Sequence, residues 1–141
     1  SSSHSYFTAL TSFVEALGLG DAVDFAGSVS DGERSAHYAT ADVFVCLSEH
    51  EGFCVPVLEA FGHDLPVVAF ASSAVPETLG AGGVLLDDKD PALVAATVHR
   101  VLTDEPLRRQ LTTAGRARLE HFSLAHSEAR LRTLIERLVG A

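Results

Sequence analysis

The sequence predicts an α/β protein with a parallel sheet that helices cover on both faces. Two observations support this fold class. Residues 43–47 (VFVCL) and 67–70 (VVAF) are continuous apolar runs, as is typical of strands covered on both faces. Between them, Pro56 suits the first turn of a helix that Gly62 can end, so residues 42–70 form one strand–helix–strand unit.

The segments before this unit have their own boundary signals. Apolar residues at helical spacing predict a first helix that ends at Gly18. Residues 23–26 predict a short strand. Ser30 and Glu33 have the spacing of a capping box, which starts a helix through about Thr40.

The segments after the unit are mainly helical. A helical turn at 76–79 and a last strand at 83–86 complete the predicted core. Asp90, Asp104 and Ser123 each suit the N-cap of a following helix. The sequence therefore predicts a helical C-terminal tail behind the α/β core.

Composition sets the class of protein. The chain has 141 residues, 47% of them hydrophobic and 21% charged, as in one globular domain. Its formal net charge of −9 argues against nucleic acid and anionic membranes as main partners. No apolar run approaches the roughly 20 residues of a membrane span, and the seven histidines show no metal-ligand spacing.

The two cysteines, Cys46 and Cys54, predict free thiols in a reducing compartment, and hence a cytoplasmic protein. Cys46 belongs to a predicted buried strand and is expected to be unreactive. Cys54 lies at a loop–helix boundary, where amide groups favour a thiolate, and is expected to react faster.

Two carboxylates lie where an α/β sheet binds ligands. Glu51 is in the loop after the strand at 43–47, and Glu59 is about one turn into the next helix. The unpaired amides of that helix N-terminus suit a phosphate. A carboxylate beside a phosphate is better placed to accept hydrogen bonds from sugar hydroxyls, which indicates a nucleotide sugar. The structural alternatives are a solvated loop residue at 51 and a helix-dipole partner at 59.

Glu51-Gly52-Phe53 followed by Val57-Leu58-Glu59-Ala60 resembles the Glu-x7-Glu motif of retaining GT-B glycosyltransferases of family four (group 1). Glu120 and Glu128 repeat the spacing on a plain helix, so the strand–loop–helix context gives the motif its specificity. Further segments that resemble the family lie at 25–29, 41–45, 66–69 and 75–77, with Tyr38 between them.

The resemblance implies a role for each site residue. Glu51 would hold hydroxyls of the donor sugar near the reacting carbon, and Glu59 would bind the ribose. Backbone amides from residue 52 to residue 55 would meet sugar or diphosphate oxygens. The backbone of Val29 would meet the nucleobase, with Arg34 close by. The donor-binding residues on the loop are thus Gly52, Phe53, Cys54 and Val55.

The resemblance also implies the reaction and the partners. A hexose would pass from a nucleotide sugar to an acceptor hydroxyl with retention of configuration, with no cofactor and no essential metal. Residues 1–141 would form part of the C-terminal donor-binding domain of a GT-B fold that is incomplete at its N-terminus. Within it, 1–88 would be the α/β core and 89–141 the helical tail.

The family's donor domain normally opens with two further strands, and an acceptor-binding domain precedes it. By itself the chain is therefore expected to be inactive. Three arrangements are expected: the two exposed strand edges meet each other directly, the missing strands come from the rest of a parent protein, or copies of the chain pair through the edges.

Two alternatives remain open from the sequence. One is another GT-B enzyme, such as a sugar-nucleotide epimerase or a phosphorylase. A phosphorylase needs a pyridoxal-binding lysine, and the one lysine, Lys89, lies in an acidic turn. The other is a non-catalytic α/β nucleotide-binding module. The sequence names neither the base, the sugar nor the acceptor.

Overall fold

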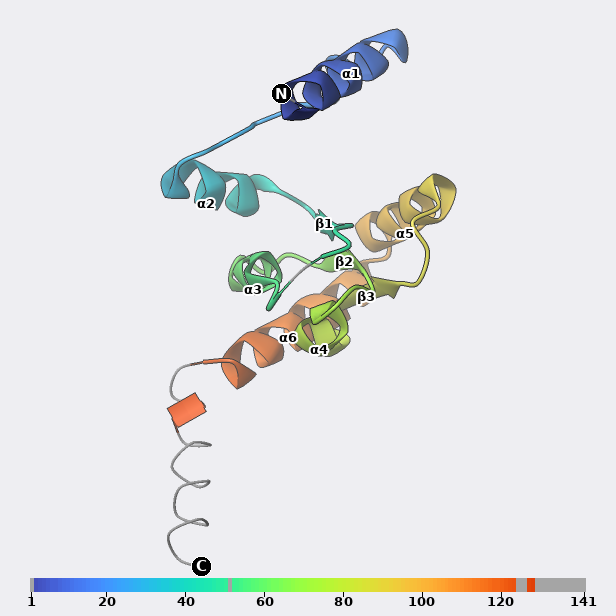
Figure 1. Ribbon diagram of the computed structural model, residues 1–141. Coiled ribbons are helices and arrows are strands. Elements are labelled where there is room, and N and C mark those ends of the chain that lie inside the picture. Colours follow the sequence, from blue (N-terminus) through green and yellow to red (C-terminus); the bar gives the residue numbers. More distant parts are fainter. Residues whose placement is uncertain (1, 51, 124–126, 129–141) are drawn as a thin grey trace, which may run out of the picture. The chain divides into compact units, whose positions relative to one another are not determined.

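The chain forms two compact units. The computed structural model describes residues 2–50, 52–123 and 127–128 (Figure 1). The units are Ser1–Arg34 and Ser35–Ala141, and their relative placement is not determined. Helix α2 (Asp31–Thr40) begins in the first unit and ends in the second.

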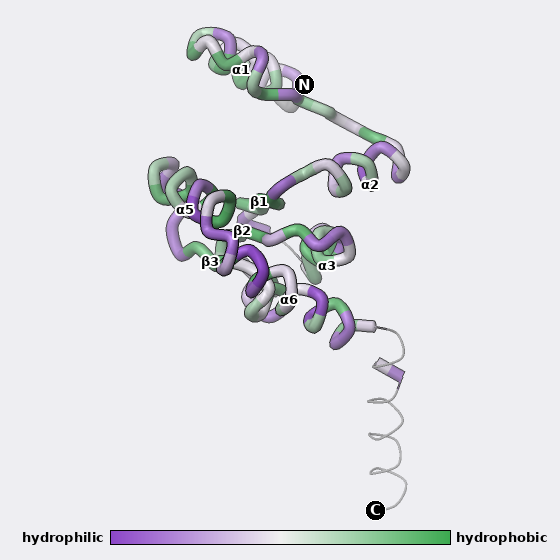
Figure 2. Tube along the Cα trace, turned by 180° about the vertical axis from the view of Figure 1, so that it is seen from behind, coloured by the Kyte–Doolittle hydropathy of each residue, from purple (hydrophilic) through white to green (hydrophobic). Residues whose placement is uncertain are grey.

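Helix α1 (Ser2–Ala16) is the main element of the first unit, with hydrophobic and hydrophilic residues interspersed along it (Figure 2). Its end at Gly18 is confirmed, because that residue has a φ of +67°, which favours glycine. The amide of Gly18 donates to the Glu15 carbonyl at 2.9 Å. Both features are those of a helix C-cap.

The strand predicted at 23–26 is wrong. Strands exist through hydrogen bonds to a neighbouring strand, and the described part of the first unit contains no strand. Instead, the Phe25 ring packs edge-on against the Phe7 ring of α1, with centroids 5.4 Å apart. The Phe25 side chain therefore packs against a helix.

Helix α2 starts at the predicted capping box, which is confirmed. The Ser30 amide donates to the Glu33 carboxylate at 2.8 Å, and the Glu33 amide donates to Ser30 Oγ at 3.3 Å. Two amides at the start of the helix thus receive acceptors.

The second unit is built on a parallel sheet of β1 (Phe44–Cys46), β2 (Val67–Phe70) and β3 (Gly83–Leu86). Their order in the sheet is β1-β2-β3. Phe44 pairs with Val67, and Val67 pairs with Gly83. Each crossover is helical, through α3 (Val55–Gly62) or α4 (Val75–Leu79), as parallel strands require.

Helices cover both faces of this sheet, which confirms the predicted fold class. Val67 and Ala69 of β2 pack into one apolar cluster with α3 and α4. The residue between them, Val68, packs into a second cluster with α5 (Pro91–Thr103) and α6 (Glu105–His121). Because successive side chains of a strand point to opposite faces of the sheet, this one strand contributes to both apolar clusters.

The coverage of β1 is less complete than the sequence predicts. Cys46 is buried, but Phe44 is half-buried and Val45 is 38% exposed. Strand β1 is an edge of the described sheet, and the helices on the Val68 face leave Val45 open to solvent. A continuous apolar run thus does not distinguish an edge strand from a central one.

The N-caps of the two helices after β3 are confirmed. Asp90 accepts from the Leu93 amide at 3.0 Å and begins α5. Asp104 accepts from the Leu107 amide at 3.0 Å and begins α6. The helix predicted after Ser123 falls mainly on residues outside those described.

The second unit is tightly packed around Phe61 of α3, which is 1% exposed. Its ring lies against Gly82, in the short 3₁₀ helix η1 (Gly80–Gly82), and against Gly115 of α6. A methyl group on Gly82 would lie 2.6 Å from Phe61 Cζ and 2.9 Å from the Gly115 backbone. These positions therefore require glycine for space.

We expect Gly82→Ala to lower the free energy of unfolding by about 1–3 kcal/mol, the usual cost of overpacking. Gly62→Ala is the matched control, because its methyl would meet its nearest neighbour at 3.8 Å, an ordinary contact. Urea denaturation of both variants measures the difference. Equal midpoints would contradict this account of the packing.

Candidate functional site

Three loops meet at the carboxyl ends of the parallel strands. The Ser72 hydroxyl, after β2, donates to the Ser48 carbonyl, after β1, at 2.7 Å. Lys89, after β3, donates to the Glu49 carboxylate. The Lys89 ammonium also lies 5.0 Å from the Phe70 ring centroid. This is the edge where open α/β sheets bind ligands.

Glu51, the predicted sugar-binding carboxylate, lies outside the described residues. Its neighbours on both sides are described. Before it, Ser48 and Glu49 make the contacts given above. After it, Gly52 is exposed and Phe53 is 50% exposed, with its ring edge-on to Phe122 at 5.1 Å.

Cys54 makes the turn from this loop into α3. Its φ of 54° and ψ of 55° are left-handed, a conformation that costs a side-chain-bearing residue about 1–2 kcal/mol. The residue is 2% exposed, whereas the next one, Val55, is 54% exposed. Strain of this kind persists only where surrounding contacts fix the backbone.

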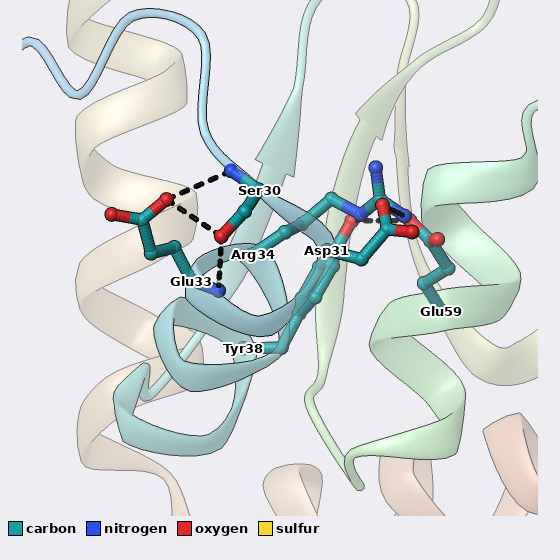
Figure 3. Close-up of polar contacts among 6 residues, drawn as sticks. All are labelled: Ser30, Asp31, Glu33, Arg34, Tyr38 and Glu59. Carbon is teal, nitrogen blue, oxygen red and sulfur yellow. Dashed lines mark hydrogen bonds and ion pairs between the residues drawn. The ribbon is translucent and has the colours of Figure 1, made fainter.

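Glu59 lies on α3 and is held by a contact that the sequence does not predict. The Tyr38 hydroxyl, on α2, donates to Glu59 Oε2 at 3.1 Å (Figure 3). Tyr38 is buried, and its ring stacks on His63 with centroids 5.5 Å apart. The half-buried carboxylate of Glu59 is thus oriented by a packed side chain.

No local pattern could have predicted this contact, because Tyr38 and Glu59 are 21 positions apart. Its only sequence signal is that Tyr38 belongs to the segments that resemble the family.

Val29 and Arg34 belong to the first unit, whereas the residues above belong to the second. Val29 is half-buried. Arg34 forms an ion pair with Asp31 at 3.0 Å on α2, beside the capping box (Figure 3). Their predicted contacts with a nucleobase stay predictions.

The electrostatics of the loop after β1 are set by Lys89. Its hydrogen bond to Glu49, with the attraction of its charge, holds the pKa of that carboxyl below the ordinary value of 4.5. Among the residues that the structure describes, no group of three metal-ligating side chains occurs.

The comparison with known families identifies the chain. Residues 4–118 match the family described as glycosyl transferases group 1. The chain belongs to this family. The prediction made from the motif around Glu51 and Glu59 is confirmed at this level.

Two curated relatives of this group 1 chain are mannosyltransferases by name. The O-antigen chain mannosyltransferase B of Escherichia coli is 34% identical over 101 residues, which are 72% of this chain and 26% of that protein. The MMP alpha-(1->4)-mannosyltransferase of Mycolicibacterium hassiacum is 32% identical over 128 residues, which are 88% of this chain and 31% of that protein. The chain thus spans less than a third of either relative.

A solved structure shows the same fold. It is the C-terminal domain of a glycosyl transferase group 1 family protein from Francisella tularensis, with a TM-score of 0.73 and 26% identity. The match covers 84% of this chain and 62% of that one. This agrees with the predicted Rossmann-like C-terminal half of a GT-B fold. In the described ranges, no helix of this group 1 chain is long and apolar enough to cross a membrane.

Both thiols should react slowly in the folded protein, because Cys46 is 9% and Cys54 2% exposed. The burial of the Cys54 side chain opposes the faster reaction that its place at a loop–helix boundary predicts. Labelling with a thiol reagent in buffer and in urea, followed by peptide mapping, measures both rates. Rapid labelling of Cys54 in buffer would contradict its burial.

Glu49 should titrate below its ordinary pKa. Because the folded-state value is lowered, its pair with Lys89 stabilises the fold above pH 4.5 and is lost as the pH falls through the lowered value. Carboxyl NMR should show the Glu49 titration moving upward in Lys89→Gln. Arg109→Gln, which removes the exposed pair with Glu105, serves as the control and should leave Glu49 unchanged.

Proposed function

We propose that this chain binds the nucleotide-sugar donor of a retaining glycosyltransferase, which transfers a hexose to an acceptor hydroxyl. The observation that carries the proposal is the oriented Glu59 carboxylate beside the start of α3 in a chain of the group 1 family. Acceptor binding and complete transfer are assigned to the whole protein that contains this chain.

The proposed roles of the site residues follow the order of the groups in the ligand: ribose, diphosphate, sugar. Glu59, which Tyr38 orients through a hydrogen bond to Oε2, is assigned the ribose diol, because a carboxylate has about four lone-pair sites and can accept several hydrogen bonds at once. The start of α3, with the amides of residues 52–55, receives the diphosphate or sugar oxygens. Glu51 then receives hydroxyls of the donor sugar, beyond the diphosphate.

Transfer would be helped mainly by stabilising the leaving diphosphate. Amides fixed near the developing charge lower the barrier because they need no reorganisation during the reaction. The left-handed turn at Cys54 supports this assignment, since it brings the loop sharply onto the helix start. Val29 and Arg34 are assigned to the nucleobase.

Mannose is the hexose to test first, because two relatives of the chain are mannosyltransferases by name. Family membership also favours a transferase over the epimerase, the phosphorylase and the non-catalytic module. Lys89 gives no support to a phosphorylase, because its ammonium is engaged with Glu49.

Glu59→Ala and Glu51→Ala should differ in which ligand they affect. Glu59→Ala should weaken binding of both the nucleoside diphosphate and the nucleotide sugar, because the proposed partner of Glu59 is the ribose. Glu51→Ala should weaken binding of the nucleotide sugar alone and slow transfer, because the proposed partner of Glu51 is the sugar. Each lost charged hydrogen bond is worth about 1.5–3 kcal/mol, or roughly a 10-fold to 150-fold change.

Calorimetric titration of the full-length protein with GDP, UDP and ADP, and with their hexose conjugates, measures these affinities. Glu120→Ala, an exposed carboxylate at the end of α6, is the control. If both site variants change the two kinds of ligand equally, the assigned division is wrong. If no nucleotide binds, the donor-site proposal fails.

A further inference from the structure

Two buried hydroxyls define an unexpected feature of the site. Besides Tyr38, the described residues include two buried side chains that carry a hydroxyl, Ser72 and Thr78, at 7% and 1% exposure. Burying a hydroxyl is unfavourable unless it is hydrogen-bonded. Both satisfy this by donating to backbone carbonyls: Ser72 to Ser48 at 2.7 Å, and Thr78 to Phe53 at 2.9 Å.

The two acceptors lie on either side of Glu51. Ser48 lies two residues after β1, and Phe53 lies just before Cys54, which makes the turn into α3. Only residues 49–52 separate the two anchored carbonyls. Within a helix, a threonine hydroxyl commonly bonds to a carbonyl one turn back, whereas that of Thr78 reaches a residue 25 positions away.

Thr78, which donates one of these hydrogen bonds, is itself held in place. Thr78 lies on α4, and the Arg118 guanidinium of α6 donates to the carbonyls of Glu77 and Thr78, the latter at 3.4 Å. Arg118 also lies over the Phe122 ring, 4.8 Å from its centroid. That ring in turn packs against Phe53. The loop end at Phe53 is therefore attached to the helical core at two points.

We propose that Ser72 and Thr78 are positioning residues, which hold the loop around Glu51 in the geometry needed for sugar transfer. The inference rests on the proposed function of Glu51. Neither hydroxyl is assigned a contact with the donor. Their effect passes through the backbone at Ser48 and Phe53, so it falls on the step that depends on the sugar rather than on nucleotide binding.

The decisive comparison is Thr78→Val against Thr78→Ser in the full-length protein. Valine keeps the volume of threonine and removes the hydroxyl, whereas serine keeps the hydroxyl. We expect Thr78→Val to lower kcat by about 10-fold to 100-fold, because a misplacement of about 1 Å by a distant mutation can cost about 100-fold. GDP or UDP affinity should stay unchanged, and Thr78→Ser should recover most of the activity.

Hydrogen exchange gives a readout that does not depend on activity. In Thr78→Val and in Ser72→Ala, amides of the peptide spanning residues 48–53 should exchange faster than in the unmodified protein. Thr97→Val is the control, because that hydroxyl also donates to a carbonyl, that of Leu93 at 2.8 Å, but lies on α5. It should change neither exchange in this peptide nor kcat.

Three outcomes would overturn the inference: unchanged exchange at 48–53, equal losses in Thr78→Val and Thr78→Ser, or a fall in nucleotide affinity as large as that in kcat. If circular dichroism shows Thr78→Val to be unfolded, Ser72→Ala decides by the same measurements. Glu51→Ala separates the two proposals. If it transfers normally, the proposed function of Glu51 is wrong; if it is slow while Ser72→Ala and Thr78→Val are normal, only the positioning role is wrong.

Discussion

The second unit depends on the close approach of three segments around one aromatic ring. Phe61 of α3 fits between Gly82 and Gly115 with no room for a methyl group at either glycine. This contact brings α6 against the helix that carries Glu59. A bidentate ion pair reinforces this contact: Arg116 of α6 donates to both carboxylate oxygens of Asp64, which lies just after α3. The site is thus built on a rigid helix pair.

Helix α6 therefore joins the core to the loop edge. Its middle, at Leu111, packs into the cluster beneath β2 and β3, and Gly115 lies against Phe61. Near its end, Arg118 holds α4, and Phe122, just after it, meets Phe53. Phe53 thus takes its support from residues that lie outside the proposed donor site.

Features with local causes could be predicted from the sequence. The caps at Ser30, Asp90 and Asp104 need only residues three positions away, and all three formed. The strands at 67–70 and 83–86 also formed as predicted. The strand at 23–26 did not form, because a strand needs a partner that no local pattern supplies.

The same limit applies to the site. The sequence suggested Glu51 and Glu59 from their context, and family membership is confirmed. The contacts of Tyr38 with Glu59 and of Thr78 with Phe53 join residues more than 20 positions apart. The burial of Cys54 depends likewise on neighbours distant in the sequence, so its place at a loop–helix boundary does not predict it.

The position of α6 late in the chain has a consequence for folding during synthesis. Strand β2 pairs with the strands next to it in sequence, so the sheet closes short loops first. Phe61 meets Gly115 only after the chain has been made well beyond β3. Phe122 emerges later still, and it supports Phe53. On the ribosome, the sheet can therefore form while Phe53 still lacks its support, and the proposed donor site is the last part of this unit to be completed.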